Sequence, residues 1–147
     1  MKNLITLISL IALCCGTGNP KFDEDHAFEY LLKQCEFGPR NPSSEGSYKC
    51  LDFMLEELDK TADDIIIQEF SYQERKHRTR HDLSNVIARY NIDSEIQTII
   101  SCHWDTRPWS DSEPNRKDRN QPIIGANDGG SGVAVLLELA KIMGENP

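Results

Sequence analysis

The fold of this chain is decided by residues 123–143, IIGANDGGSGVAVLLELAKIM, together with the earlier run QTIISC at residues 97–102. The run QTIISC has almost no polar side chains in its middle, which predicts a β-strand covered on both faces. The second half of residues 123–143 repeats apolar residues at helical spacing and predicts an amphipathic helix. The apolar side of that helix consists of Val133, Leu136, Leu137, Ala140 and Met143.

The sequence before this region predicts two helices followed by two strands. Apolar residues at helical spacing indicate helices at residues 23–36 and 44–60. Short β-rich runs indicate strands at residues 64–72 and 84–90. Helices, then strands, then another helix predict an α/β fold, a three-layer sandwich with a central mixed β-sheet.

The composition favours one acidic domain. The 147 residues are enough for a single core, and 24 acidic against 16 basic residues give a formal net charge of −8. Because such a chain repels phosphate backbones, we expect no nucleic-acid partner.

The first 15 residues have the pattern of a signal peptide. Lys2 is followed by an apolar run at residues 4–13 and by Cys14 and Cys15. The run is too short to span a bilayer, so we expect an exported protein in the periplasm or at the cell surface. The paired cysteines are also reminiscent of a lipoprotein signal, although the residues before them fit that pattern imperfectly. Lipidation and simple secretion therefore stay open, and a membrane contact is expected only through such an anchor.

Three cysteines follow this leader: Cys35, Cys50 and Cys102. An odd number in an exported protein permits one disulfide and one free thiol, with Cys35 and Cys50 as a candidate pair. Their spacing is not that of a zinc finger.

Polar side chains that suit a metal follow the expected buried strand. His103 and Asp105 leave the end of that strand two residues apart, so both side chains point to the same side of an extended chain. A carboxylate in this position can orient an imidazole or hold a cation. Asp128 precedes a glycine-rich turn and the helix, where a plain N-capping role is the alternative to metal binding. His103 by itself also suits simple packing.

The combination of motifs narrows these alternatives. The sequence CHWDTRPW at residues 102–109, GANDGGSG at residues 125–132 and the shorter FGPR at residues 37–40 resemble one group of zinc enzymes. This group comprises the bacterial glutaminyl-peptide cyclotransferases and the related zinc-dependent aminopeptidases. The resemblance covers roughly residues 22–147 and implies a zinc-exopeptidase-like fold.

The resemblance also implies roles for single residues. Asp128 corresponds to a Zn²⁺ ligand of the group. His103 corresponds to a ligand of a second zinc in the two-metal aminopeptidases, and to a neighbour that does not ligate in the single-zinc cyclases. Asp105 would orient His103. Trp104 and Trp109 are candidates for lining the substrate pocket, with core packing as the alternative for Trp104.

The implied activity is conversion of the N-terminal glutamine of peptides or proteins to pyroglutamate with release of ammonia. The alternatives are a two-zinc aminopeptidase that removes N-terminal residues, and a noncatalytic surface lipoprotein of the same fold. The group's glutamate general acid and base and its remaining ligands are expected beyond Pro147. Residues 22–147 are therefore interpreted as the N-terminal part of the domain, expected to be inactive alone. Animal cyclases that resemble this chain pair the cysteine before the HxD histidine with a second cysteine just past the metal aspartate. This disulfide is expected to be absent because Val133 occupies the partner position, which would leave Cys102 a buried thiol.

Overall fold

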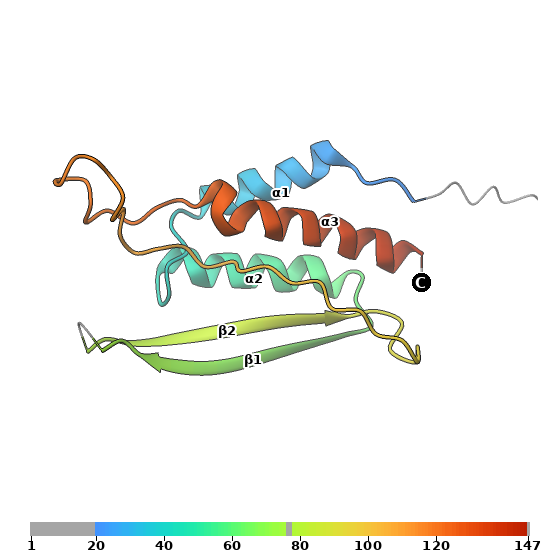
Figure 1. The fold of residues 1–147 in the computed structure, drawn as a ribbon. Helices are drawn as coiled ribbons and strands as arrows, with labels where there is room; N and C mark the ends of the chain where they lie inside the picture. Colours follow the sequence, from blue (N-terminus) through green and yellow to red (C-terminus); the bar gives the residue numbers. More distant parts are fainter. Residues whose placement is uncertain (1–19, 76–77, 147) are drawn as a thin grey trace, which may run out of the picture.

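The computed structural model describes residues 20–75 and 78–146, and within them it contains three helices and one β-hairpin. Helix α3 lies between α1 and α2, and the hairpin lies on the other side of α2 (Figure 1). The expected leader at residues 1–15 lies outside the described residues. None of the helices in the described part has the length and apolar character needed to cross a membrane. The elements are α1 (Glu24–Glu36), α2 (Glu45–Asp59), β1 (Asp64–Gln73), β2 (Arg80–Arg89), the short π-helical turn η1 (Ala126–Gly130) and α3 (Ser131–Glu145).

Both N-terminal helices begin at side-chain caps, which confirms the predicted starts. The Asp23 carboxylate accepts a hydrogen bond from the backbone N–H of His26 at 3.0 Å. The Ser44 hydroxyl accepts one from the backbone N–H of Ser47 at 3.1 Å. Each cap satisfies a backbone donor that the first helical turn leaves without a partner.

The core forms where the three helices meet. Val133 and Leu137 of α3 are each 4% exposed, and Met54 of α2 is 5% exposed. Burying an aliphatic side chain of this size contributes roughly 1.5–3 kcal/mol. The predicted apolar side of α3 is therefore confirmed over its first turns, although Met143 near the end of the helix is 44% exposed. The residues of the core cluster are Tyr30, Cys50, Met54, Val133, Ala134 and Leu137.

Strands β1 and β2 pair as an antiparallel hairpin, with Ile66 opposite Ile87 and Phe70 opposite Leu83. Strand β2 begins at Arg80, earlier than the predicted start at residue 84. Side chains across the pair extend the ladder, because the Arg80 guanidinium donates to Ser71 Oγ at 2.7 Å and the hydroxyl of Ser71 donates to Asp82 at 3.0 Å.

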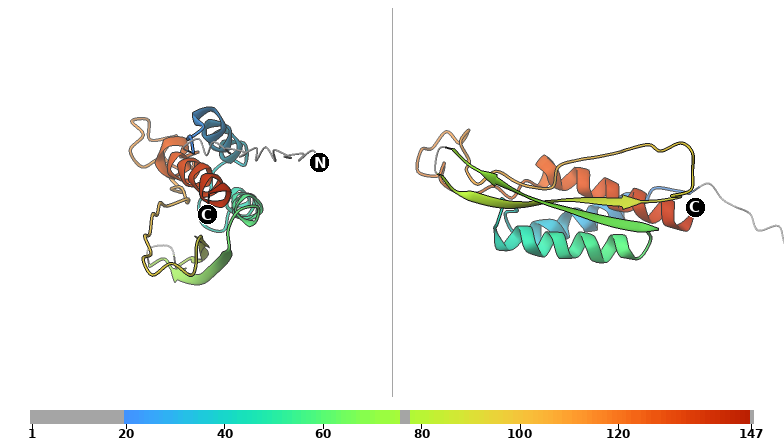
Figure 2. Two further views of the ribbon diagram at one scale, coloured as in Figure 1. Left: turned by 90° about the vertical axis from the view of Figure 1, so that its right-hand side faces the viewer. Right: turned by 90° about the horizontal axis from the view of Figure 1, so that it is seen from below.

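The predicted strand at residues 97–102 is wrong for the described residues. This stretch joins no ladder, and the hairpin is the whole of the described sheet. Both views in Figure 2 show the yellow chain before Cys102 running apart from the hairpin. Ile99 is 91% exposed and Ile96 83% exposed, so the run is not covered on either face. An apolar run favours burial, but a strand also needs a neighbouring strand as its hydrogen-bond partner.

All three described cysteines are free, so the candidate Cys35–Cys50 disulfide is not formed. Cys50 is fully buried, and desolvation raises the pKa of its thiol to about 11. Cys102 is exposed rather than buried as expected, because the run that carries it has no covering strand. Val133, the expected partner position of Cys102, is a buried core residue.

Candidate metal centre

Two segments bring His103, Asp105 and Asp128 together. His103 and Asp105 follow the extended run, and Asp128 lies in turn η1 at the start of α3. His103 Nε2 lies 3.1 Å from Asp128 Oδ1, and His103 Nδ1 lies 3.1 Å from the Asp105 carbonyl oxygen. The side chains of His103 and Asp128 are about half exposed, at 54% and 55%, so a ligand can reach them from solvent.

Asp128 does not cap α3, so the capping alternative is wrong. The N-cap of α3 is Gly130, with no side-chain hydrogen bond. Asp128 itself has non-helical backbone angles of φ −90° and ψ 93°. Gly129 follows with φ 94°, a value that side chains disfavour. The turn therefore directs the Asp128 carboxylate to His103 rather than to the start of its own helix.

The hydrogen-bond chemistry of His103 leaves one interaction unsatisfied. A backbone carbonyl can only accept, so Nδ1 must donate to the Asp105 carbonyl oxygen. The Nε2 atom of a neutral ring then carries a lone pair, and this lone pair faces another acceptor, Asp128 Oδ1. Two acceptors at 3.1 Å are satisfied only when a proton or a metal cation lies between them.

The two donors fit Zn²⁺ in chemistry and spacing. Zinc binds imidazole nitrogen and carboxylate oxygen at about 2.0–2.2 Å, so two such donors at the tetrahedral angle lie about 3.3–3.5 Å apart. The observed separation of 3.1 Å is slightly shorter, so a small outward shift of either side chain would accommodate the ion. Within residues 20–75 and 78–146, no cluster of three or more ligating side chains is present. The described residues thus bring together two side chains whose chemistry suits zinc.

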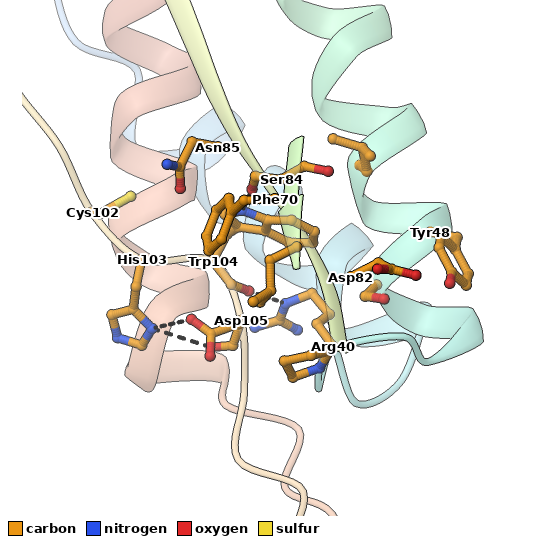
Figure 3. A pocket seen from close by; sticks show the side chains of 14 residues that line it. Arg40, Tyr48, Phe70, Asp82, Ser84, Asn85, Cys102, His103, Trp104 and Asp105 are labelled. Carbon is orange, nitrogen blue, oxygen red and sulfur yellow. Dashed lines mark hydrogen bonds and ion pairs between the residues drawn. The ribbon is translucent and has the colours of Figure 1, made fainter. Parts of the chain in front are cut away.

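Asp105 contacts the opposite side of the His103 ring. Its Oδ1 atom lies 3.5 Å from His103 Nδ1, farther than the Asp105 carbonyl oxygen, which lies 3.1 Å from the same nitrogen. Both contacts fix the ring orientation, and Figure 3 shows the two groups side by side. This is the geometry that an orienting role for Asp105 requires.

The two tryptophans lie in different environments. Trp104 packs beside the core, and its indole N–H donates to the Ser84 carbonyl oxygen at 3.0 Å. It also lines a cavity of about 310 Å³ between the hairpin, α2 and the His103 segment, seen in Figure 3. Trp109 is 40% exposed in the loop after residue 106 and does not line this cavity. Core packing, left open for Trp104, is therefore observed, and the structure does not bring the two rings together around the cavity.

Sequence reasoning missed two arginines near the site. Arg107 Nη2 lies 4.0 Å from Asp128 Oδ2, while its Nη1 donates to Asp111 at 2.9 Å. Arg40 is fully buried and donates to the carbonyl oxygens of Trp104 and Gly125. The sequence motifs FGPR and HWDTRPW contain both residues, but nothing in their spacing indicates that they approach the site.

Glu138 is not a further site residue. Its side chain is 1% exposed, and Oε2 lies 2.6 Å from His26 Nδ1. The pair joins α3 to α1 further along the helix from turn η1. Glu138 therefore links two helices and lies away from His103 and Asp128.

The helices, the hairpin and the paired donors before α3 define an α/β protein of the zinc-exopeptidase type. Residues 85–147 match the sequence model of peptidase family M28. The resemblance to zinc-dependent cyclases and peptidases that was inferred from the sequence is thereby confirmed.

Solved structures agree with this assignment. The glutaminyl cyclase of Bacteroides thetaiotaomicron, bound to N-acetylhistamine, is 34% identical with a TM-score of 0.82, and that of Tannerella forsythia is 31% identical with a TM-score of 0.83. A Zn-dependent exopeptidase from Parabacteroides distasonis is 33% identical with a TM-score of 0.83. Each match covers 86% of this chain and 43% of the other, so the chain spans less than half the length of these structures.

Proposed function

We propose that this chain supplies Asp128 as a ligand, with His103 as its neighbour, to the zinc site of an enzyme that converts N-terminal glutamine of peptides to pyroglutamate. The observation that carries the proposal is the 3.1 Å approach of His103 Nε2 to an Asp128 carboxylate that has no capping role. Bacterial glutaminyl cyclases among the similar structures and the HWDTRPW motif at residues 103–109 support this choice of activity.

The residues of the chain would act as follows. Asp128 would hold the metal, with His103 beside it and Asp105 fixing the imidazole ring. When bound, zinc would supply a Lewis acid that polarises the side-chain carbonyl of the substrate glutamine. The half-exposed mouth of the site leaves room for a peptide N-terminus to approach. Ring closure is intramolecular, so holding the folded substrate conformer contributes much of the rate enhancement.

A second candidate is a two-metal aminopeptidase, and a specific observation favours it. His103 Nε2 lies 3.1 Å from Asp128 Oδ1, which suits a histidine that ligates a metal beside this carboxylate. A similar structure described as a leucine aminopeptidase precursor, 34% identical, agrees with this alternative.

One experiment tests the proposal at the level of the metal. The 147-residue chain is titrated with Co²⁺ as a zinc substitute, and binding is followed by the loss of amide signals near the metal in two-dimensional NMR spectra. We expect Asp128→Ala to weaken binding by at least tenfold, because one of two ligands is lost. Asp93→Ala, at an exposed turn away from the site, is the matched control and should bind as the wild type does. Equal binding by Asp128→Ala and the wild type would refute the metal site.

A second measurement separates the two activities. The complete gene product is incubated with a glutamine peptide and, separately, with a leucine anilide. Loss of ammonia from the glutamine peptide, detected by mass spectrometry, supports the cyclase. Release of leucine from the anilide, two zinc ions per chain and no ring closure of the glutamine peptide would refute the cyclase and support the aminopeptidase.

We propose peptide or protein N-termini as the substrates of the whole protein and export to the periplasm or cell surface as its location, with a lipid anchor as an open alternative. The pattern of Lys2, the apolar run at residues 4–13 and Cys14 supports export.

A further inference from the structure

A buried arginine lies behind the metal-site segments without an acidic partner. The Arg40 side chain is 0% exposed. No ion pair joins it to a carboxylate within the described part of the chain. A buried guanidinium without a counter-charge is costly and persists only when other groups satisfy its donors.

Backbone carbonyl groups satisfy those donors, and they come from both sides of the site. Nε donates to the Trp104 carbonyl oxygen at 3.1 Å, in the peptide between His103 and Asp105. Nη1 and Nη2 donate, each at 3.0 Å, to the carbonyl oxygens of residues 124 and 125, immediately before turn η1. The planar fork of the guanidinium thus joins the segment that carries His103 to the one that carries Asp128.

The Gly125 carbonyl oxygen has a second role in the turn. It also accepts the backbone N–H of Gly130 at 3.1 Å, the bond that closes the turn around Asp128. The Gly125 carbonyl oxygen therefore accepts two hydrogen bonds, one from the Arg40 side chain and one from the Gly130 backbone within the turn. A shift of the guanidinium would move the turn that directs the Asp128 carboxylate.

The backbone of Arg40 makes a parallel connection through Thr106. Its N–H donates to Thr106 Oγ1 at 2.9 Å, and its carbonyl oxygen accepts the Thr106 N–H at 3.3 Å. Thr106 is 3% exposed, and its Cγ2 atom would clash with a Cβ at Gly125. Side chain and backbone of Arg40 thus link the same two segments.

We propose that Arg40 is a positioning residue that sets the distance between His103 and Asp128 and thereby the affinity of the site for a divalent metal. The proposal rests on the proposed function, because it assumes that these two side chains bind metal. Lysine cannot replace arginine in this role, since an ammonium group lacks the planar fork that reaches four carbonyl oxygens, one of them on Gln34 of α1 and the others in the two metal-site segments.

The test compares Co²⁺ affinity with folding in four variants of the 147-residue chain. Arg40→Lys keeps the charge and should weaken Co²⁺ binding at least fivefold well below its melting temperature. Arg89→Lys makes the same substitution at an exposed ion pair with Asp64 and should bind as the wild type does. Thr106→Val keeps the side-chain shape but removes the acceptor for the Arg40 N–H, and should weaken binding two- to threefold.

The outcomes separate a positioning role from a purely structural one. A structural role alone would lower the melting temperature of Arg40→Lys and leave the Co²⁺ affinity of the folded protein unchanged, which would overturn the proposal. If Arg40→Lys does not fold, the Thr106→Val variant decides: weaker binding supports the proposal, and wild-type binding overturns it. The fourth variant, Asp128→Ala, isolates the proposed function. If Asp128→Ala binds Co²⁺ as tightly as the wild type, the proposed metal site is refuted, and the positioning role of Arg40 is refuted with it. If Asp128→Ala binds more weakly, the metal site stands, and the Arg40 and Thr106 variants alone decide whether Arg40 positions it.

Discussion

Replacing Gly129 by alanine separates backbone strain from contact with the candidate metal ligand. Gly129 has φ 94° and ψ −52°, and a Cβ atom there would lie 3.1 Å from His103 Cε1 and 3.2 Å from His103 Nδ1. Gly38 is the matched control, because it has φ 84° and an added Cβ would meet nothing within 4 Å. Both substitutions strain the backbone, and only the first displaces the imidazole.

The expected magnitudes follow from these two contributions. A non-glycine residue in such a conformation costs about 1–3 kcal/mol. For a domain of this size 1 kcal/mol corresponds to about 4 °C, so both variants should melt about 4–12 °C below the wild type. The His103 side chain is 54% exposed and can move away at little further cost in stability. The displaced ring would lose its position beside Asp128, which we expect to weaken Co²⁺ binding about fivefold, or about 1 kcal/mol.

Thermal unfolding followed by circular dichroism measures the first effect, and Co²⁺ titration at a temperature where both variants are folded measures the second. We expect Gly38→Ala to retain wild-type affinity while Gly129→Ala does not. Two observations would refute the reasoning. One is Gly129→Ala melting with the wild type, and the other is the two variants binding Co²⁺ equally well.

Two further predictions concern the core. His26→Ala should lower the free energy of unfolding by about 1–3 kcal/mol. This is less than the cost of removing one partner from a fully buried ion pair. The reason is that Glu138 keeps its contacts with the Asp23 N–H at 3.3 Å and with Lys141 at 3.9 Å. Urea unfolding measures this free energy. If His26→Ala lowers it by the same amount in a Glu138→Gln protein as in the wild type, the loss does not come from the contact between His26 and Glu138. Burial raises the pKa of Cys50 from 9.0 to about 11, so the folded state binds a proton that the unfolded state releases at high pH. This contribution to stability is complete below pH 9 and is lost between pH 9 and 11. Between pH 8 and 11 the wild type should therefore lose about 1–2 kcal/mol more than Cys50→Ala; parallel pH profiles would contradict this.

Local patterns were sufficient for the helices. Asp23 and Ser44 lie at the predicted helix starts and cap the two helices. The helical spacing of Val133 and Leu137 predicted which side of α3 is buried. These features depend on neighbours three or four residues away, so one short segment contains the information. The hairpin was also predicted as two strands, because each of its β-rich runs has a partner nearby in the chain.

Contacts between distant segments could not be predicted in this way. The side-chain bonds of Arg40 to the metal-site segments span 64 to 85 positions, and no periodic pattern records them. Whether Asp128 caps its helix could not be predicted, because an acidic residue just before a helix suits a cap as well as other roles. The three-dimensional course of the turn, with Gly129 at positive φ, shows that Asp128 does not cap α3.

The exposed run before Cys102 has a consequence for how the protein behaves in concentrated solution. Ile96, Ile99 and Ile100 are 83%, 91% and 62% exposed beside backbone that joins no ladder among the described residues. Such a segment is a template on which another copy can add a strand, which is the first step of aggregation. Electrostatic repulsion between copies opposes that step, with a formal charge of −8 at pH 7 that vanishes near pH 4.9. Acidity and high salt are therefore the conditions under which the molecule is least soluble.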